Sequence, residues 1–121
     1  GGYCMFFNGY KYHNGSSSAY GASYGNGDII GIALDMDNTS ITFYKNGSSQ
    51  GVAWSNISAG AYSPAMGSDQ TGRDTTVYAN FGQDSSFSGQ KTAQGNQDGN
   101  GIGDFYYTPP SGYLALCSAN Q

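Results

Sequence analysis

Hydrophobic and polar residues alternate along most of the chain with a period of two, which is the spacing of a half-buried β-strand. No stretch repeats its apolar residues at the spacing of an α-helix. The alternation predicts strands at residues 3–7, 10–13, 29–35, 40–45, 50–54, 62–67, 76–81 and 113–117, and a loop with at most a short edge strand at 15–27. We therefore expect an all-β fold of short antiparallel strands joined by tight turns.

The predicted core consists of the apolar residues that share one face of the stronger strands. In residues 40–45, for example, Ile41 and Phe43 fall on one face, and Thr42 and Tyr44 fall on the other. We expect these residues to be buried together: Ile30, Ile32, Leu34, Ile41, Phe43, Val77, Phe81, Leu114 and Leu116.

Turn chemistry separates the predicted strands. Asn46-Gly47 is a strong hairpin signal, and an Asp-Asn pair supplies the polar turn at residues 36–39. The carboxylate of Asp28 can accept hydrogen bonds from turn amides before the next strand. Gly31 lies inside a strand, which predicts a ring or backbone packed closely over it.

The composition changes after residue 81. Residues 82–103 contain Phe87 and Ile102 as their large apolar residues, which predicts a long polar loop. We expect a single domain with three parts: residues 1–82 as one half of a β-sandwich, 83–103 as a long Gly-rich polar loop, and 104–121 as closing strands of the same sandwich.

The charge of the chain excludes two classes of partner. The net charge is −4 with four Lys and Arg in 121 residues, so the chain lacks the cations that neutralise nucleic-acid phosphates or an anionic membrane. No apolar run is long enough to cross a bilayer. We expect no nucleic-acid partner and no membrane insertion.

The two cysteines, Cys4 and Cys117, leave two alternatives open. Both lie in apolar runs, where they can be buried free thiols. They can also form a disulfide between the first and last strands, provided that these strands are neighbours.

Catalysis is disfavoured by the residue inventory. His13 is the only histidine, the acids are all Asp, and no nucleophile–base set with believable geometry can be assembled. We interpret His13 as an edge-strand histidine and predict that the protein is not an enzyme.

The candidate cation ligands lie in the polar loop. Asp98, Asn100 and Asp104 place oxygen atoms at offsets that resemble the start of a calcium loop. Ile102 occupies a position where a further oxygen ligand is expected, and no bidentate Glu follows. The alternative is a Gly-rich turn without metal; otherwise we expect no cofactor.

The candidate ligand-binding residues are Tyr10, Tyr12, Tyr20 and Tyr24. Tyrosine beside Asn and Ser is typical of surfaces that bind sugars or proteins, because rings stack while small polar groups hydrogen-bond. The alternative is that these rings fill a sandwich core that is short of Leu and Val.

Two segments carry a family resemblance. Residues 27–35 read GDIIGIALD and residues 41–47 read ITFYKNG. This combination resembles the SPRY family, with GD-apolar-apolar-G-apolar-x-apolar-D, a turn, and then apolar-x-F-x-x-N-G. Residues 51–54 (GVAW) and 62–65 (YSPA) are similar to further family segments. The resemblance implies an antiparallel SPRY-like, concanavalin-like β-sandwich, of which this chain looks like an incomplete copy carrying the C-terminal half.

The tail adds a narrower resemblance. Residues 109–117 read PPSGYLALC, which is similar to a segment of SPRY-containing structural proteins of tailed bacteriophages. This resemblance implies a virion or extracellular module, such as a tail fibre, spike or capsid decoration. Its partners would be other virion subunits, as a homo-oligomer, and host-surface glycan or protein. The alternative is a SPRY protein-interaction adaptor that recognises a peptide through its loops.

Overall fold

The computed structural model describes residues 2–66 and 76–121 and divides the chain into two compact units, residues 1–59 and 60–121. Each unit is described by itself. The elements are β1 (Tyr3–Met5), β2 (Tyr10–His13), β3 (Ser16–Ala19), β4 (Ile30–Asp35), β5 (Ser40–Lys45), β6 (Ser48–Trp54) and the short 3₁₀ helix η1 (Ser118–Asn120). Within the described residues, no helix is long and apolar enough to cross a membrane.

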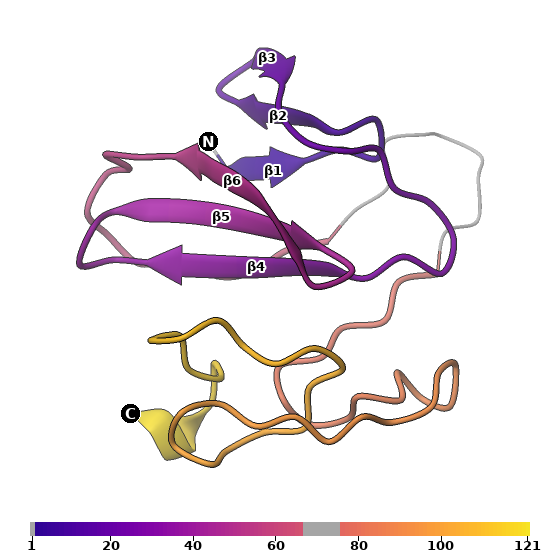
Figure 1. Cartoon of the computed structure of the whole chain (residues 1–121). Helices are drawn as coiled ribbons and strands as arrows, with labels where there is room; N and C mark the ends of the chain where they lie inside the picture. The colour runs from indigo at the N-terminus through magenta and orange to yellow at the C-terminus, as the bar shows by residue number, and fades with distance from the viewer. Residues whose placement is uncertain (1, 67–75) are drawn as a thin grey trace. The chain divides into compact units, whose positions relative to one another are not determined.

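The first unit contains two antiparallel sheets, in the strand orders β1-β2-β3 and β4-β5-β6 (Figure 1). Every strand pairs with its neighbour in the sequence, so hairpins build each sheet. The prediction of an all-β, antiparallel fold is confirmed.

Two Asn-Gly turns close hairpins in the first unit. Asn14-Gly15 joins β2 to β3 and Asn46-Gly47 joins β5 to β6, and all four residues have positive φ angles between 49° and 82°. Asparagine and glycine tolerate this left-handed region, and a turn of this hand matches the twist of the strands it connects. The turn predicted at residues 46–47 is therefore confirmed.

Asp28 and Asn46 join the start of β4 to the turn that follows β5. Asn46 Nδ2 donates to Asp28 Oδ1 over 2.9 Å, and Asn46 Oδ1 accepts from the amide of Ile29 over 2.9 Å. The second carboxylate oxygen of Asp28 accepts from the amide of Gly25 over 2.9 Å. This confirms the expectation that Asp28 accepts from turn amides before β4.

Gly31 lies opposite Tyr44 in the ladder between β4 and β5. A Cβ atom at position 31 would stand 3.3 Å from the Cβ of Tyr44, which is closer than ordinary van der Waals contact. The predicted close approach over Gly31 is confirmed, and the neighbour is this tyrosine.

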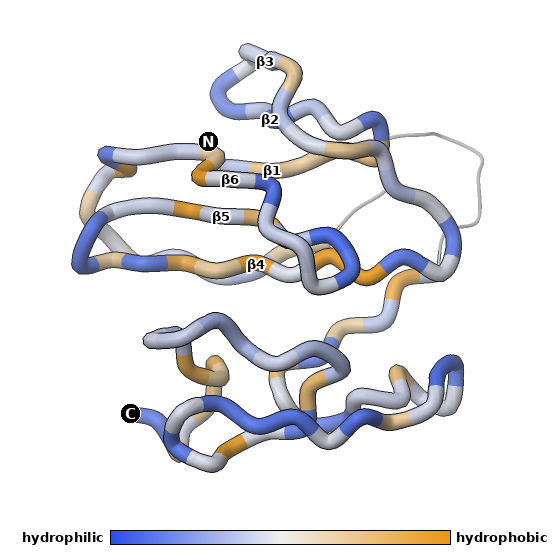
Figure 2. The backbone as a smooth tube through the Cα atoms, viewed as in Figure 1, coloured by the Kyte–Doolittle hydropathy of each residue, from blue (hydrophilic) through white to orange (hydrophobic). Residues whose placement is uncertain are grey.

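The core of the first unit lies between the two sheets. Apolar positions recur along β4 and β5 (Figure 2). The buried cluster comprises Met5, Ile41, Phe43, Ala53 and Ile57, with Tyr3, Tyr20, Tyr24, Ile30 and Trp54 packed against it. Aromatic residues thus supply much of the enclosed area, as expected for a chain with few aliphatic side chains.

Much of the predicted core is wrong. Ile41 and Phe43 are buried and Ile30 is half-buried, but Ile32 and Leu34 are exposed. The reason is that β4 is an edge strand of its sheet, so the cluster centred on β5 leaves Ile32 and Leu34 uncovered, while Ala33 on the opposite face of β4 is buried. The remaining predicted core residues lie in the second unit and are also exposed: Val77, Phe81, Leu114 and Leu116.

The strands predicted in the second unit are also wrong. Residues 62–66, 76–81 and 113–117 form no strand, and residue 67 lies outside the described residues. Side chains here accept hydrogen bonds from backbone amides that would pair with a neighbouring strand in a sheet. Asp98, for example, accepts from the amide of Ala115 over 2.9 Å. The alternation of apolar and polar residues is therefore not sufficient to form a β-sheet in these segments.

Polar side chains organise the second unit. Ser85 is fully buried, and its hydroxyl donates to Asp104 Oδ1 over 2.6 Å while accepting from the amide of Gln94 over 2.9 Å. Asn96 and Phe105 form an antiparallel bridge. The predicted polar loop at 83–103 thus has a defined structure here. That residues 104–121 close the same sandwich as residues 1–82 stays a prediction.

Two residues that face each other across β4 and β5 test the position of the core. Ile41 is 6% exposed and its register partner Leu34 is 38% exposed. Because Ile41 is enclosed, Ile41→Ala should lower the free energy of unfolding by about 2–5 kcal/mol, whereas Leu34→Ala should cost less than about 2 kcal/mol. Denaturant unfolding of both variants checks this. Equal losses would show that β4 is covered as fully as β5.

Two substitutions at Asn46 separate its backbone role from its side-chain role. Asn46→Gly keeps the positive φ angle but removes two hydrogen bonds, so it should cost about 1–2 kcal/mol. Asn46→Ala adds the strain of a left-handed Ala and should cost about 1 kcal/mol more. Urea unfolding measures both. A neutral Asn46→Gly would mean that the hydrogen bonds to Asp28 and Ile29 do not stabilise the sheet.

Candidate binding surface

An open hollow of about 420 Å³ lies on the β2–β3 hairpin. Its lining residues are Lys11, His13, Asn14, Trp54 and the serines at positions 16, 17 and 18. Lys11 and His13 are two residues apart in β2, so their side chains share a face of the sheet. Ser18 and Ser16 are their register partners in β3 and lie on the same face, while Trp54 comes from the end of β6.

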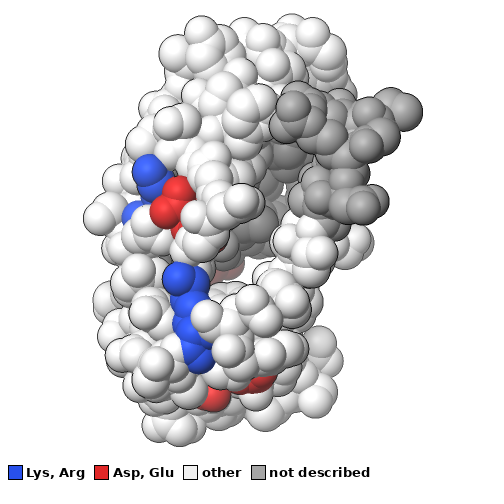
Figure 3. Space-filling model, turned by 90° about the vertical axis from the view of Figure 1, so that its right-hand side faces the viewer, with Lys and Arg blue, Asp and Glu red and all other residues white. Residues whose placement is uncertain are grey.

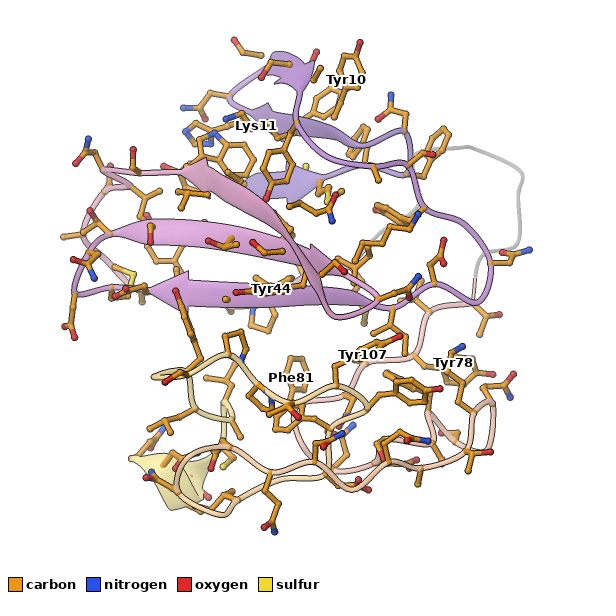
Figure 4. All side chains as sticks on the ribbon, viewed as in Figure 1. Tyr10, Lys11, Tyr44, Tyr78, Phe81 and Tyr107 are labelled. Atoms are coloured by element: carbon orange, nitrogen blue, oxygen red, sulfur yellow. The ribbon has the colours of Figure 1, made fainter. Side chains whose placement is uncertain are left out.

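Lys11 supplies the positive charge of the hollow. Its Nζ donates to the carbonyl of Ala53 over 2.5 Å, and it lies 5.4 Å from the ring centroid of Trp54 and 5.8 Å from that of Tyr20. The two rings and the carbonyl hold the ammonium between β2 and β6. Figure 4 labels Lys11 on β2. An ammonium has three N–H groups, and Ala53 accepts from one of them.

His13 forms one wall of the same hollow. Its ring stacks on Tyr3 at 3.8 Å between centroids, with an interplanar angle of 6°. Its Nε2 lies 3.0 Å from Asn14 Nδ2, and its Nδ1 lies 3.0 Å from the carbonyl oxygen of Gly2. Because Asn14 Nδ2 can only donate, Nδ1 carries the proton given to Gly2. Both ring nitrogens are therefore occupied in positioning the histidine.

The predicted ligand-binding tyrosines divide into two groups. Tyr20 and Tyr24 pack against the core, where the Tyr20 hydroxyl donates to the carbonyl of Gly51 and the Tyr24 hydroxyl donates to that of Met5 over 2.8 Å. These contacts match the alternative that the rings fill the core. A role for these two tyrosines in ligand binding stays a prediction.

Tyr10 and Tyr12 lie on the face of β2 opposite to Lys11. Tyr12 stacks on Phe6 at 4.0 Å between centroids, and Tyr10 is exposed. Figure 4 labels Tyr10 on the same strand as Lys11. Neither tyrosine lines the hollow.

Sequence reasoning missed the residues that do line the hollow. The signal was present but weak: Lys11 interrupts a run of aromatic residues, and three consecutive serines follow the next turn. The contact of Lys11 with Ala53 spans 42 positions in the sequence. No local pattern reveals such a contact.

Charged groups are sparse around this surface. The face of the molecule drawn in Figure 3 is largely uncharged, with a few blue and red groups, some of them side by side. Among residues 2–59, the cations are Lys11 and Lys45, and the acids Asp28, Asp35 and Asp37 lie just outside or at the ends of β4. Among the described residues, no acid lines the hollow, so none of their carboxylates pairs with Lys11 there.

Comparison with known families places this surface in context. The family model described as "SPRY domain" matches residues 2–84 and extends beyond the motif-bearing residues 27–67 on both sides. The match covers the N-terminal part of the chain, so the interpretation of an incomplete copy that carries the C-terminal half is not supported. The chain belongs to the SPRY family. The hollow and both sheets of the first unit therefore lie inside the SPRY match.

Relatives of this SPRY chain are larger proteins. It is 30% identical over 114 residues to the ATP-dependent RNA helicase Ddx1 of Drosophila melanogaster, which covers 92% of the chain and 12% of the helicase. It is 36% identical over 70 residues to Ran-binding protein 10 of Danio rerio, covering 58% of the chain and 11% of that protein. Human Ran-binding protein 9 is 34% identical over 70 residues, covering 58% of the chain and 9% of that protein.

The chain spans about a tenth of the length of these relatives. Helicase activity is named for the whole Ddx1 protein, of which this chain matches 12%. The SPRY domain itself is a non-catalytic interaction domain. No solved structure matches the chain significantly.

The predicted cation ligands lie beyond the SPRY match. Asp98 accepts from the amides of Ala115 and Ile102 and from Asn120 Nδ2, and Asp104 accepts from Ser85. The backbone amide of Asn100 donates a hydrogen bond to Asp98 Oδ1 over 2.9 Å. Asp98 and Asp104 thus serve different hydrogen-bond networks, which fits the alternative of a closed turn. In the described residues, no group of three or more His, Cys, Asp or Glu could hold a metal. Calcium binding stays a prediction.

A second hollow, of about 320 Å³, lies in the unit formed by residues 60–121. Its lining is largely apolar and includes Phe81, Ile102 and Leu116. Its described lining contains no charged side chain, so this lining favours no particular class of ligand.

Both cysteines are free thiols and half-buried. Cys4 is 3.9 Å from the carbonyl oxygen of Tyr12, and burial raises the pKa of its thiol. Cys117 accepts from Asn120 Nδ2 over 3.7 Å. Cys4 lies in the first unit and Cys117 in the second, so a disulfide between them stays a prediction.

Asp98 makes the stability of the second unit depend on pH. Hydrogen bonds, first that from the amide of Ala115, lower its pKa from 3.8 to about 2. Because the folded-state pKa lies below the unfolded one, its stabilising contribution is present above pH 3.8 and is lost as the pH falls toward about 2. Asp98→Asn should lower the melting temperature at pH 7, and the difference from wild type should shrink below pH 3.8.

Thermal melts from pH 7 to pH 2, with exchange of the Ala115 amide as a local probe, measure this effect. Asp37→Asn, in the exposed turn after β4, is the matched control and should leave Ala115 exchange unchanged. A constant difference between Asp98→Asn and wild type at every pH would show that the carboxylate charge has no role.

Proposed function

We propose that this SPRY domain is a non-catalytic adaptor that binds a peptide segment of a partner protein in the hollow beside the β2–β3 hairpin. The observation that carries the proposal is the lining itself. A cation held over Trp54, with exposed serines and Asn14 beside it, offers a ring face, a charge and several hydrogen-bonding groups at one place. Such combinations of aromatic and small polar groups are common in protein-binding surfaces.

The family supports this role. SPRY is an interaction domain, and two of the relatives described above carry "Ran-binding" in their names. Those names describe the relatives. For this chain, the proposed partner is defined by the chemistry of the residues that line its hollow. The proposal concerns a peptide and not Ran itself.

The virion or extracellular role implied by residues 109–117 is the less supported reading. None of the three relatives described above is a virion protein, and the SPRY match ends at residue 84, before that segment. Location in a virion, assembly into a homo-oligomer and binding of glycan stay predictions.

A hollow-filling substitution tests the proposed function. Ser18→Trp places a large side chain in the hollow, and Ser23→Trp places the same side chain on an exposed loop residue that does not line it. Peptides are selected from a random-sequence display library with the wild-type chain, and their dissociation constants are then measured for both variants. We expect Ser18→Trp to weaken binding at least about tenfold, or about 1.4 kcal/mol, and Ser23→Trp to have little effect.

Amide-exchange protection of both variants confirms that each is folded before binding is compared. Two results would refute the proposal: a library that yields no binding peptide, or peptides that bind Ser18→Trp as tightly as wild type.

A further inference from the structure

The edge of the first sheet is open at β3. Its strand order is β1-β2-β3, so Ser16–Ala19 pairs with β2 on one side, and all four of its residues are exposed. Figure 1 shows β3 as the outer strand of this hairpin. Edge strands are usually protected by lysine, proline or a bulge, and β3 contains none of these. It therefore offers an unprotected backbone template.

The register identifies the backbone groups that point outward. The amide of Phe6 donates to the carbonyl of Tyr10 over 2.9 Å, so Tyr10 directs its backbone groups toward the β1 side. In an antiparallel sheet this direction alternates, and Lys11 and His13 therefore bond toward β3. Their partners Ser18 and Ser16 bond inward, which leaves the N–H and C=O groups of Ser17 and Ala19 pointing away from the sheet.

These outward groups have no protein partner among the described residues. Apart from its pairing with β2, no residue from Ser16 to Ala19 makes a backbone hydrogen bond within the residues that the structure describes. Two N–H groups and two C=O groups, spaced as in a strand, match the backbone of a further extended segment.

The hollow lies along the same edge. A residue of an added strand opposite Ser16 or Ser18 would place its side chain on the face that carries Lys11 and His13. Among the residues that the structure describes, that face presents an ammonium and no carboxylate. An acidic side chain is the complement of this arrangement.

We propose that the partner peptide binds as an additional β-strand along β3, with an Asp or Glu side chain directed into the hollow toward Lys11. This inference rests on the proposed function and specifies its geometry and chemistry. A second copy of the chain fits less well, because another β3 would bring serines and no acid to Lys11. Nucleic acid fits less well because the hollow contains a single cation from Lys or Arg.

Ala19 permits a backbone test. Ala19→Pro removes an outward N–H at the end of β3 and leaves the inward bonds to β2 in place. Ala19→Gly keeps that N–H and is the matched control. Library-selected peptides should bind Ala19→Pro at least tenfold more weakly than the wild-type chain, because one hydrogen bond between the two backbones is lost. They should bind Ala19→Gly within threefold of wild type. Exchange of the Ser17 and Ala19 amides should slow when peptide binds to the wild-type chain.

Lys11 permits a charge test. Lys11→Met keeps the length of the side chain and removes its charge. Replacing Glu by Gln in a selected peptide should weaken binding to the wild-type chain severalfold and should have no further effect on Lys11→Met. Added salt should reduce wild-type affinity and not that of Lys11→Met.

The outcomes separate the two proposals. Peptides that bind Ser18→Trp weakly but bind Ala19→Pro normally would overturn strand addition and leave the hollow as the binding site. If the selected peptides bind all of these variants as tightly as the wild-type chain, both proposals are overturned. Sedimentation that shows a dimer of the chain, abolished by Ala19→Pro, would overturn the peptide as occupant of the edge in favour of a second copy.

Discussion

The hydrogen bonds of the Asn46 side chain with Asp28 and with the amide of Ile29 tie the start of β4 to the turn that follows β5, and the rest of the first unit depends on the register that they help to fix. Position 46 must combine a positive φ angle with a side chain that both donates and accepts, which favours asparagine. A slip of one residue in this ladder would turn Ile41 and Phe43 away from the core. The turn thus determines which face of the sheet can be buried.

Once that face is set, tyrosines connect the two sheets. The ring of Tyr20 packs against Phe43 at 6.1 Å between centroids, and its hydroxyl accepts from the amide of Phe43 over 3.2 Å. Tyr24 reaches the carbonyl of Met5 in the other sheet. A buried tyrosine needs a partner for its hydroxyl, and these partners fix where the loop after β3 can run. The β2–β3 hairpin is then anchored at Lys11, while its outer edge stays in solvent.

In the second unit, the described residues satisfy their backbone groups without forming strands. Asp98 and Asp104 accept hydrogen bonds from backbone amides and hydroxyls that would otherwise lack partners, so buried polar groups replace a ladder. In the described residues, no buried side-chain nitrogen or oxygen is left without a hydrogen bond. The SPRY match ends at residue 84, and the proposed binding surface lies wholly before it. Strand ladders thus satisfy backbone groups in the first unit, and polar side chains do so in the second.

The sequence by itself determined the all-β class, the strands at β2, β4 and β5, the Asn46-Gly47 turn and the SPRY membership, because alternation, turn chemistry and motif are encoded in adjacent residues. The tertiary structure alone decided that Leu34 is exposed while Ile41 is buried, although both carry the same local pattern. It also decided that Lys11 meets Ala53 and Trp54 to form a hollow. Burial and binding surfaces depend on which distant residues pack together, and a local period cannot specify that choice.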